Sequence, residues 1–273
     1  MKERDLSSTV AIAGLGAIGL DLARALDRGV EGLRLTAVAA RDAAKAEANL
    51  AGFAHRPALV PIGELADHAD IIVEAAPAAV FEAVALPAIR RGRIFVPSSV
   101  GALLPRMHLV EEARRSGARI VVPTGALLGL DAVRAAAEGE VASVTIETRK
   151  PPGGLAGAPY LTERGMDMAA IREPTLVFRG NAVDAARGFP ANVNVAAALG
   201  LAGIGPERTG VEIWADPTVT RNTHTIRVEA AAARFVMTIE GVPTEANPRT
   251  GKLTPLSLIA CLRGLVSTLK VGS

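Results

Sequence analysis

The chain has 273 residues, of which 49% are hydrophobic, 21% charged and 3% aromatic. This length and apolar content suit one large or two ordinary globular domains and exclude a disordered or collagen-like chain. Thirty Lys and Arg against 28 Asp and Glu leave a net charge of +2, which excludes a bulk attraction to nucleic acid or anionic lipid. A single cysteine, Cys261, excludes an internal disulfide and a cysteine-based metal cluster.

Neither a secretory leader nor a membrane helix is expected. The first eight residues are polar and of mixed charge, and the apolar run that follows is short and interrupted by glycines. No stretch reaches the roughly 18 apolar residues that a membrane helix needs. We therefore expect a cytoplasmic protein that binds neither membrane nor nucleic acid.

The first half of the sequence alternates short apolar runs with helical patterns. Strands are predicted at 9–13, 33–39, 70–75, 93–97 and 118–122, and helices at 18–28, 42–50, 80–90 and 105–116. Asp42 is a candidate N-cap. This alternation predicts an α/β Rossmann domain over residues 1–125, with a doubly wound parallel sheet.

The pattern of predicted helices and strands changes after Pro123. Helices are predicted at 130–138, 194–202 and 255–269, and strands at 141–149, 175–179, 209–215, 224–229 and 233–239. No helical pattern separates the last three strands, which favours a mainly antiparallel sheet. We expect an α+β catalytic and dimerisation domain over 126–254. The segment 255–273 is expected to pack back on the Rossmann domain through Leu256, Ile259, Leu262 and Val266.

A glycine-rich turn joins the first strand to the first helix. Gly14-Leu-Gly-Ala-Ile-Gly19 has the G-x-G-x-x-G pattern in the strand–turn–helix context that dinucleotide binding requires. Gly14 permits the tight turn, Gly16 lets a diphosphate approach the backbone, and Gly19 lets the helix pack on the sheet. The free amides where the helix begins, at Ala17 and Ile18, attract the diphosphate. A purely structural turn is the alternative.

The end of the second strand leaves the cofactor open between NAD and NADP. Arg41 can pair with a 2′-phosphate, whereas Asp42 can accept from a 2′-hydroxyl. Alternatively, Arg41 is solvated and Asp42 only caps a helix. Two further loops follow strands, where ligands bind in such sheets, and they make Pro77, Ser99 and Gly101 cofactor candidates unless the loops are ordinary turns.

Few residues in the second half can move protons. His55, His68 and His108 belong to the first half and are expected at the surface, and no spacing suits a metal. His224 lies in a polar turn before a strand. It is either a catalytic acid–base or a strand-edge histidine.

The sequence resembles the L-aspartate dehydrogenase family along nearly its whole length. The resemblance rests on the glycine turn and on the segments 99–103, 123–126, 129–131, 148–152, 157–160, 189–197, 215–217, 222–224, 247–248 and 256–263. It implies that His224 is catalytic, and that Ala126 and Asn192 or Asn194 meet the nicotinamide. The chain departs from the family pattern at Thr124 and at 229–231, away from the catalytic positions.

Oxidation of an amino acid to an imine requires a deprotonated amine, which suits His224 as the base. Asn222 faces the same side of the strand and is expected to orient the ring or the substrate. Arg149, Lys150 and Arg221 are candidates for the substrate carboxylates, and capping of a helix is the alternative role for Asn194.

The main interpretation is an NAD(P)-dependent L-aspartate dehydrogenase, a homodimer that makes iminoaspartate, a precursor for NAD biosynthesis, or oxaloacetate. The reaction direction stays open. A dehydrogenase or reductase for another small acid, such as homoserine or a dihydrodipicolinate-type substrate, is the enzymatic alternative. A dinucleotide-sensing protein is the non-enzymatic one.

Overall fold

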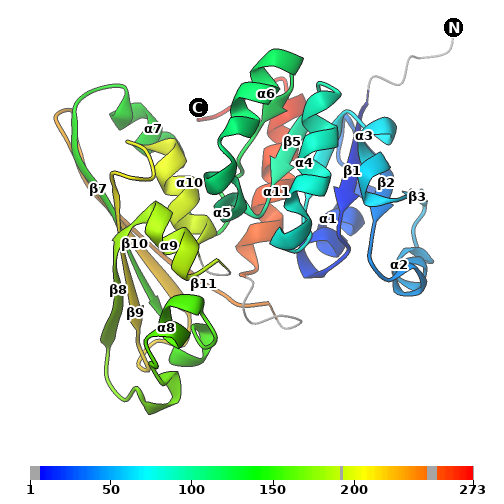
Figure 1. The fold of residues 1–273 in the computed structure, drawn as a ribbon. Helices are drawn as coiled ribbons and strands as arrows, with labels where there is room; N and C mark the ends of the chain where they lie inside the picture. Colours follow the sequence, from blue (N-terminus) through cyan, green and yellow to red (C-terminus); the bar gives the residue numbers. More distant parts are fainter. Residues whose placement is uncertain (1–6, 191–192, 245–250, 273) are drawn as a thin grey trace, which may run out of the picture. The chain divides into compact units, whose positions relative to one another are not determined.

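A computed structural model describes residues 7–190, 193–244 and 251–272 (Figure 1). The chain divides into two compact units. The first unit comprises Met1–Ser99, Pro105–Pro123 and Thr254–Val271, and the second comprises Val100–Leu104, Thr124–Leu253 and Gly272–Ser273. The short segment 100–104 therefore groups with the second unit, although the sequence places it inside the range 1–125.

The first unit is built on a six-stranded sheet in the order β3-β2-β1-β4-β5-β6, with every pairing parallel. Its strands are β1 (Ser8–Ala13), β2 (Leu33–Ala39), β3 (Ala58–Leu59), β4 (Ile71–Glu74), β5 (Ile94–Pro97) and β6 (Arg119–Ile120). The predicted doubly wound parallel sheet is confirmed. The two-residue β3 was not predicted, because so short a strand has no periodicity of its own.

The helices of the first unit are α1 (Ala17–Asp27), α2 (Ala43–Leu50), α3 (Leu65–His68), α4 (Phe81–Arg90), α6 (His108–Ser116) and α11 (Leu253–Val266). All were expected from their periodicity except the four-residue α3, which is too short to show a period. Asp42 caps α2 by accepting from the Lys45 N–H at 2.9 Å. On α11 the predicted face is wrong in one position, because Leu256 is 58% exposed while Leu258 and Leu262 are fully buried in the core beneath the sheet.

A five-stranded mixed sheet forms the second unit, in the order β11-β10-β7-β9-β8. Its strands are β7 (Val141–Lys150), β8 (Thr175–Asn181), β9 (Thr209–Ala215), β10 (Asn222–Ala230) and β11 (Arg234–Gly241). Three of the pairings are antiparallel, as predicted, but β7 pairs in parallel with β9. A parallel pair requires a long crossover, and the chain between these two strands supplies it.

Helices cover one face of this mixed sheet. They are α5 (Val100–Leu103), α7 (Leu130–Ala137), α8 (Pro159–Glu163), α9 (Ala182–Gly188) and α10 (Asn194–Ala202). Alternate residues of β7 and β10, such as Ile146 and Ile226, pack with Val133 and Leu199 of the helices in one apolar core. Because side chains two residues apart on a strand share a face, the residues of β7 and β10 that are in step with Ile146 and Ile226 lie on the helix-covered face.

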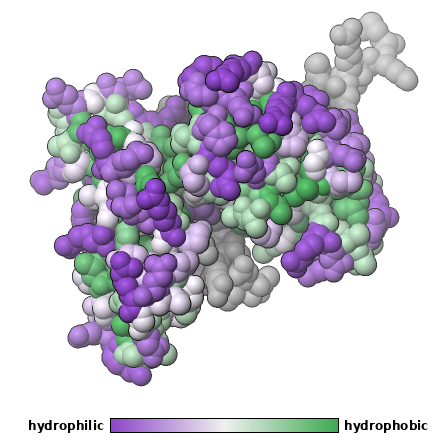
Figure 2. All heavy atoms as spheres, viewed as in Figure 1, coloured by the Kyte–Doolittle hydropathy of each residue, from purple (hydrophilic) through white to green (hydrophobic). Residues whose placement is uncertain are grey.

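Hydrophilic residues dominate the visible surface, with hydrophobic ones scattered among them (Figure 2). In the described part of the chain, no helix is both long and apolar enough to cross a bilayer.

Candidate functional site

The glycine turn after β1 has the close backbone approaches that its sequence predicts. Gly14 has φ +96°, and a Cβ atom placed there would lie 2.5 Å from the carbonyl oxygen of Ala75. A Cβ at Gly19 would lie 1.9 Å from the Gly14 carbonyl oxygen. Both positions exclude a side chain, so the turn can form only with glycine at 14 and 19.

Gly16 differs, because a Cβ atom there would meet nothing within 4 Å. Gly16 is the N-cap of α1, and no side chain caps the helix. The first amides of α1, at Ala17 and Ile18, therefore have no side-chain cap and lie at the positive end of the helix dipole. Open backbone and uncapped amides fit the diphosphate of a dinucleotide.

At the end of β2, the two side chains that could contact the cofactor ribose, Arg41 and Asp42, differ in their surroundings. The Asp42 carboxylate is engaged as the cap of α2. Arg41 is exposed beside it. Arg41 is thus the side chain in this turn that has no capping role.

A buried carboxylate that the sequence analysis missed joins two loops beside the glycine turn. Glu74, at the end of β4, is fully buried and accepts hydrogen bonds from the Ala76 N–H (3.0 Å), the Ser99 N–H (2.9 Å) and the Ser99 hydroxyl (3.0 Å). Burial raises the Glu74 pKa, whereas these hydrogen bonds oppose the shift. The Ser99 hydroxyl therefore serves the loop itself, and exposed Pro77 follows on the loop that Glu74 holds.

In the second unit, Asn194 bonds to the short helix α5. Its Oδ1 accepts from the Gly101 N–H at 3.0 Å, and a Cβ at Gly101 would lie 2.9 Å from Val193. Asn194 is the first residue of α10 and not its cap, so the capping alternative does not describe it. Asn192 lies outside the described residues. Ala126 is half-buried beside Gly125, whose φ of +68° shapes the turn.

His224 lies among buried polar side chains on the helix-covered face of the second sheet. His224, Thr148 and Lys150 are only 5%, 3% and 6% exposed. Thr148 pairs with His224 across β7 and β10, and its Oγ1 lies 2.9 Å from His224 Nδ1. Because side chains alternate along a strand, Lys150 shares the face of Thr148, and half-buried Asn222 shares that of His224.

Burial changes the proton affinity of this cluster. It lowers the pKa of His224 to about 3, with a further contribution from the positive charge of Lys150. The pKa of Lys150 falls to about 8, also through burial. His224 is therefore a neutral imidazole at ordinary pH, and Lys150 changes its charge within the usual assay range.

The other cationic candidates lie elsewhere. Arg149 points to the opposite face, where it pairs with Glu147 (2.6 Å) and Asp216 (3.0 Å) and stacks on the Trp214 ring (4.6 Å). Arg221 is exposed. Sequence proximity could not distinguish these residues from Lys150, whereas the strand alternation does.

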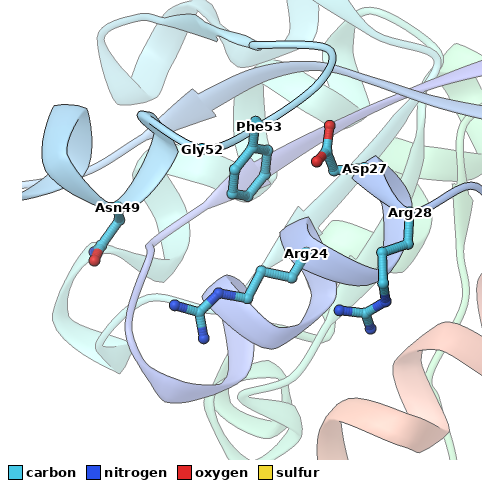
Figure 3. Close-up of a pocket in the computed structure, with 6 residues that line it drawn as sticks. All are labelled: Arg24, Asp27, Arg28, Asn49, Gly52 and Phe53. Atoms are coloured by element: carbon cyan, nitrogen blue, oxygen red, sulfur yellow. The ribbon is translucent and has the colours of Figure 1, made fainter.

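A surface hollow of about 270 Å³ lies beside the C-terminal half of α1 (Figure 3). Its lining comprises Arg24, Asp27, Arg28, Asn49, Gly52 and Phe53. Asp27 is engaged by the backbone N–H groups of Ala54 and His55. The glycine turn lies at the other end of the helix, so the hollow does not coincide with the cofactor candidates.

His55, His68 and His108 are exposed. Within the described ranges, no group of three or more His, Cys, Asp or Glu side chains is arranged to hold a metal ion.

Comparisons with known proteins define the class first. Residues 14–123 match the family described as homoserine dehydrogenase, NAD binding domain, and residues 131–265 match aspartate dehydrogenase, C-terminal. Together with the glycine turn, these matches make the chain an oxidoreductase that uses a nicotinamide dinucleotide.

The relatives then identify the family. L-aspartate dehydrogenase of Bradyrhizobium diazoefficiens is 56% identical over 97% of this chain and 94% of its own length. L-aspartate dehydrogenase 3 of Bordetella bronchiseptica is 52% identical over 97% of this chain and 97% of its own length. The crystal structure of aspartate dehydrogenase from Thermotoga maritima superposes with a TM-score of 0.72 at 27% identity, covering 97% of this chain and 99% of that one. The chain belongs to the L-aspartate dehydrogenase family, which confirms the resemblance seen in the sequence.

Proposed function

We propose that the protein is an L-aspartate dehydrogenase that converts L-aspartate, NAD(P)⁺ and water into oxaloacetate, ammonia and NAD(P)H through iminoaspartate. The observation that carries the proposal is the buried face of β7 and β10, which presents His224, Lys150 and Asn222 together. The full-length similarity to proteins named L-aspartate dehydrogenase supports the choice of substrate.

The first unit binds the cofactor in this proposal. The open backbone at Gly16 and the amides of Ala17 and Ile18 hold the diphosphate. Glu74 fixes the loops that carry Pro77 and Ser99, and the resemblance assigns Ala126 and Asn192 or Asn194 to the nicotinamide end. When bound, the nicotinamide accepts a hydride from the substrate. Arg41 beside the ribose favours acceptance of NADP as well as NAD.

The second unit binds the amino acid. Lys150 is the stronger candidate for taking the proton of the substrate ammonium, since its pKa of about 8 is far closer to that of an amine than the value of about 3 for His224. This revises the role expected for His224 from the sequence. His224 remains catalytic as a neutral polar group that contacts the substrate, and the Asn222 amide orients it.

An amino-acid panel tests the proposal. We expect NADH or NADPH formation with L-aspartate and none with D-aspartate or homoserine. Turnover of homoserine instead would favour the other-acid alternative. Tight dinucleotide binding without turnover of any substrate would favour the sensing protein.

We also propose a homodimer that forms through the face of the second sheet opposite the helices, where Trp214 is half-buried and Val236 is 56% exposed. Light scattering on the full chain tests this, and a monomeric mass would contradict it. A cytoplasmic location remains a prediction of the composition.

A further inference from the structure

We infer that Thr148 is a positioning residue that donates its hydroxyl hydrogen to Nδ1 of His224, so that His224 presents an Nε2–H donor to an oxygen atom of the substrate. This inference rests on the proposed function for the role of His224, and it deepens it by assigning the tautomer. In this role the imidazole of His224 donates a hydrogen bond to the substrate and does not accept a proton from it.

A buried hydrogen bond joins Thr148 to His224. Thr148 Oγ1 and His224 Nδ1 are 2.9 Å apart, and both side chains are at most 5% exposed. A threonine hydroxyl has one hydrogen to donate, and a neutral imidazole has one N–H and one acceptor nitrogen. Either Thr148 donates and Nε2 carries the ring hydrogen, or Nδ1 donates and Nε2 is bare.

The surroundings of Thr148 decide between these two arrangements. Among the residues that the structure describes, His224 Nδ1 is the one hydrogen-bond partner of the Thr148 hydroxyl. Its strand pairs on both sides, with β10 and β9, so the neighbouring backbone carbonyls are engaged in the sheet. If Nδ1 donated, the buried Thr148 hydrogen would have no acceptor, which costs free energy. Donation by Thr148 satisfies both groups.

The resulting tautomer suits the substrate chemistry. A neutral Nε2–H group can donate to a carboxylate oxygen of a dicarboxylic amino acid or to the carbonyl oxygen of the corresponding keto acid. Burial and the charge of Lys150 keep the ring from protonating, and the hydroxyl of Thr148 then holds the neutral ring in one tautomer. Lys150, on the same face, is left to exchange protons.

Nitrogen NMR of the full chain with ¹⁵N-labelled histidine rings reads the tautomer directly. The spectrum of His224→Gln assigns the His224 signals among the four histidines. We expect a bare Nδ1 and a protonated Nε2 in the wild type and in Thr148→Ser, which retains the hydroxyl. Thr148→Val, which keeps the shape but not the donor, is expected to show a mixture of tautomers. A protonated Nδ1 in the wild type, or an unchanged spectrum in Thr148→Val, would overturn the inference.

Kinetics test the same point independently. Loss of one hydrogen bond predicts a fall in kcat of about tenfold for Thr148→Val, with cofactor Kd unchanged and with recovery to within about twofold in Thr148→Ser. His224→Gln keeps an amide donor and should exceed His224→Leu in kcat by about tenfold. Equal losses in these two variants would overturn the donor role.

The two proposals fail separately. A wild type without turnover of L-aspartate removes the proposed function, while the NMR spectrum still decides the tautomer. Conversely, a wild type that turns over L-aspartate with a bare Nε2 retains the proposed function and removes the inference.

Discussion

Replacing Lys150 by methionine should lower activity and raise stability at the same time. Lys150 is 6% exposed, and burial lowers its pKa from 10.5 to about 8. This lowering of the pKa corresponds to a free-energy cost of up to about 3 kcal/mol for the charged form in the folded state. Methionine fills similar space without a charge, so we expect the free energy of unfolding at pH 7 to rise by up to that amount.

The pH dependence of stability follows from the same shift. Below pH 8 the lysine is protonated in both the folded and the unfolded chain, and the cost is present in full. Between pH 8 and about 10.5 the folded chain loses the proton while the unfolded chain keeps it, so wild-type stability rises with pH. Urea denaturation at several pH values should show this rise in the wild type and its absence in Lys150→Met.

The same substitution should lower activity. If Lys150 accepts the substrate proton, about a tenth of the enzyme is competent at pH 7 and about nine-tenths at pH 9, so the rate rises through about pH 8. Lys150→Met should lose this rise together with on the order of 10²–10⁴-fold in kcat.

Arg149→Met is the matched control, since Arg149 is the adjacent cation on the opposite face of β7. It should lose stability and keep the pH profile of the rate. A Lys150→Met enzyme that retained the wild-type pH profile would refute the reasoning and assign the ionisation to another group.

Four further substitutions test the remaining residues. Gly16→Val should fold, because its side chain meets open space, and should lose cofactor binding measured by NADH fluorescence. Retained affinity would show that the glycine turn is not part of the cofactor site. His224→Ala should lower kcat on the order of 10²–10³-fold with cofactor Kd unchanged, and wild-type turnover would contradict its role. Glu74→Gln, which removes one acceptor for Ser99, should raise the cofactor KM more than it lowers kcat; a KM unchanged from the wild type would make Glu74 structural only. Arg41→Ala should weaken NADPH binding and spare NADH, and equal effects would remove Arg41 from the ribose site.

The sequence determined the parts of the molecule that depend on neighbouring residues. The glycine turn at 14–19 and the Asp42 cap are local, because each requires particular residue types within one turn of chain. The parallel sheet followed from alternating strand and helix patterns. The strand at 222–230 also placed Asn222 and His224 on one face by its period of two.

Short elements could not be predicted in this way. The strand β3 has two residues and the helix α8 has five, and each is too short to show a period. Such segments are stabilised by packing against larger elements and not by their own helix or strand propensity. The seven-residue α9 was missed for the same reason.

Only the tertiary structure decided the chemistry of the second unit. Arg149 and Lys150 are adjacent cations in the sequence, yet helices cover one face of β7 and leave the other partly open, so Lys150 is buried while Arg149 forms ion pairs. Thr148 and His224 are 76 residues apart and meet only because β7 and β10 pair. Glu74 likewise bonds to Ser99 across two parallel strands. A pKa depends on solvent access and on neighbouring charges, and both are properties of the packed chain and not of residue order.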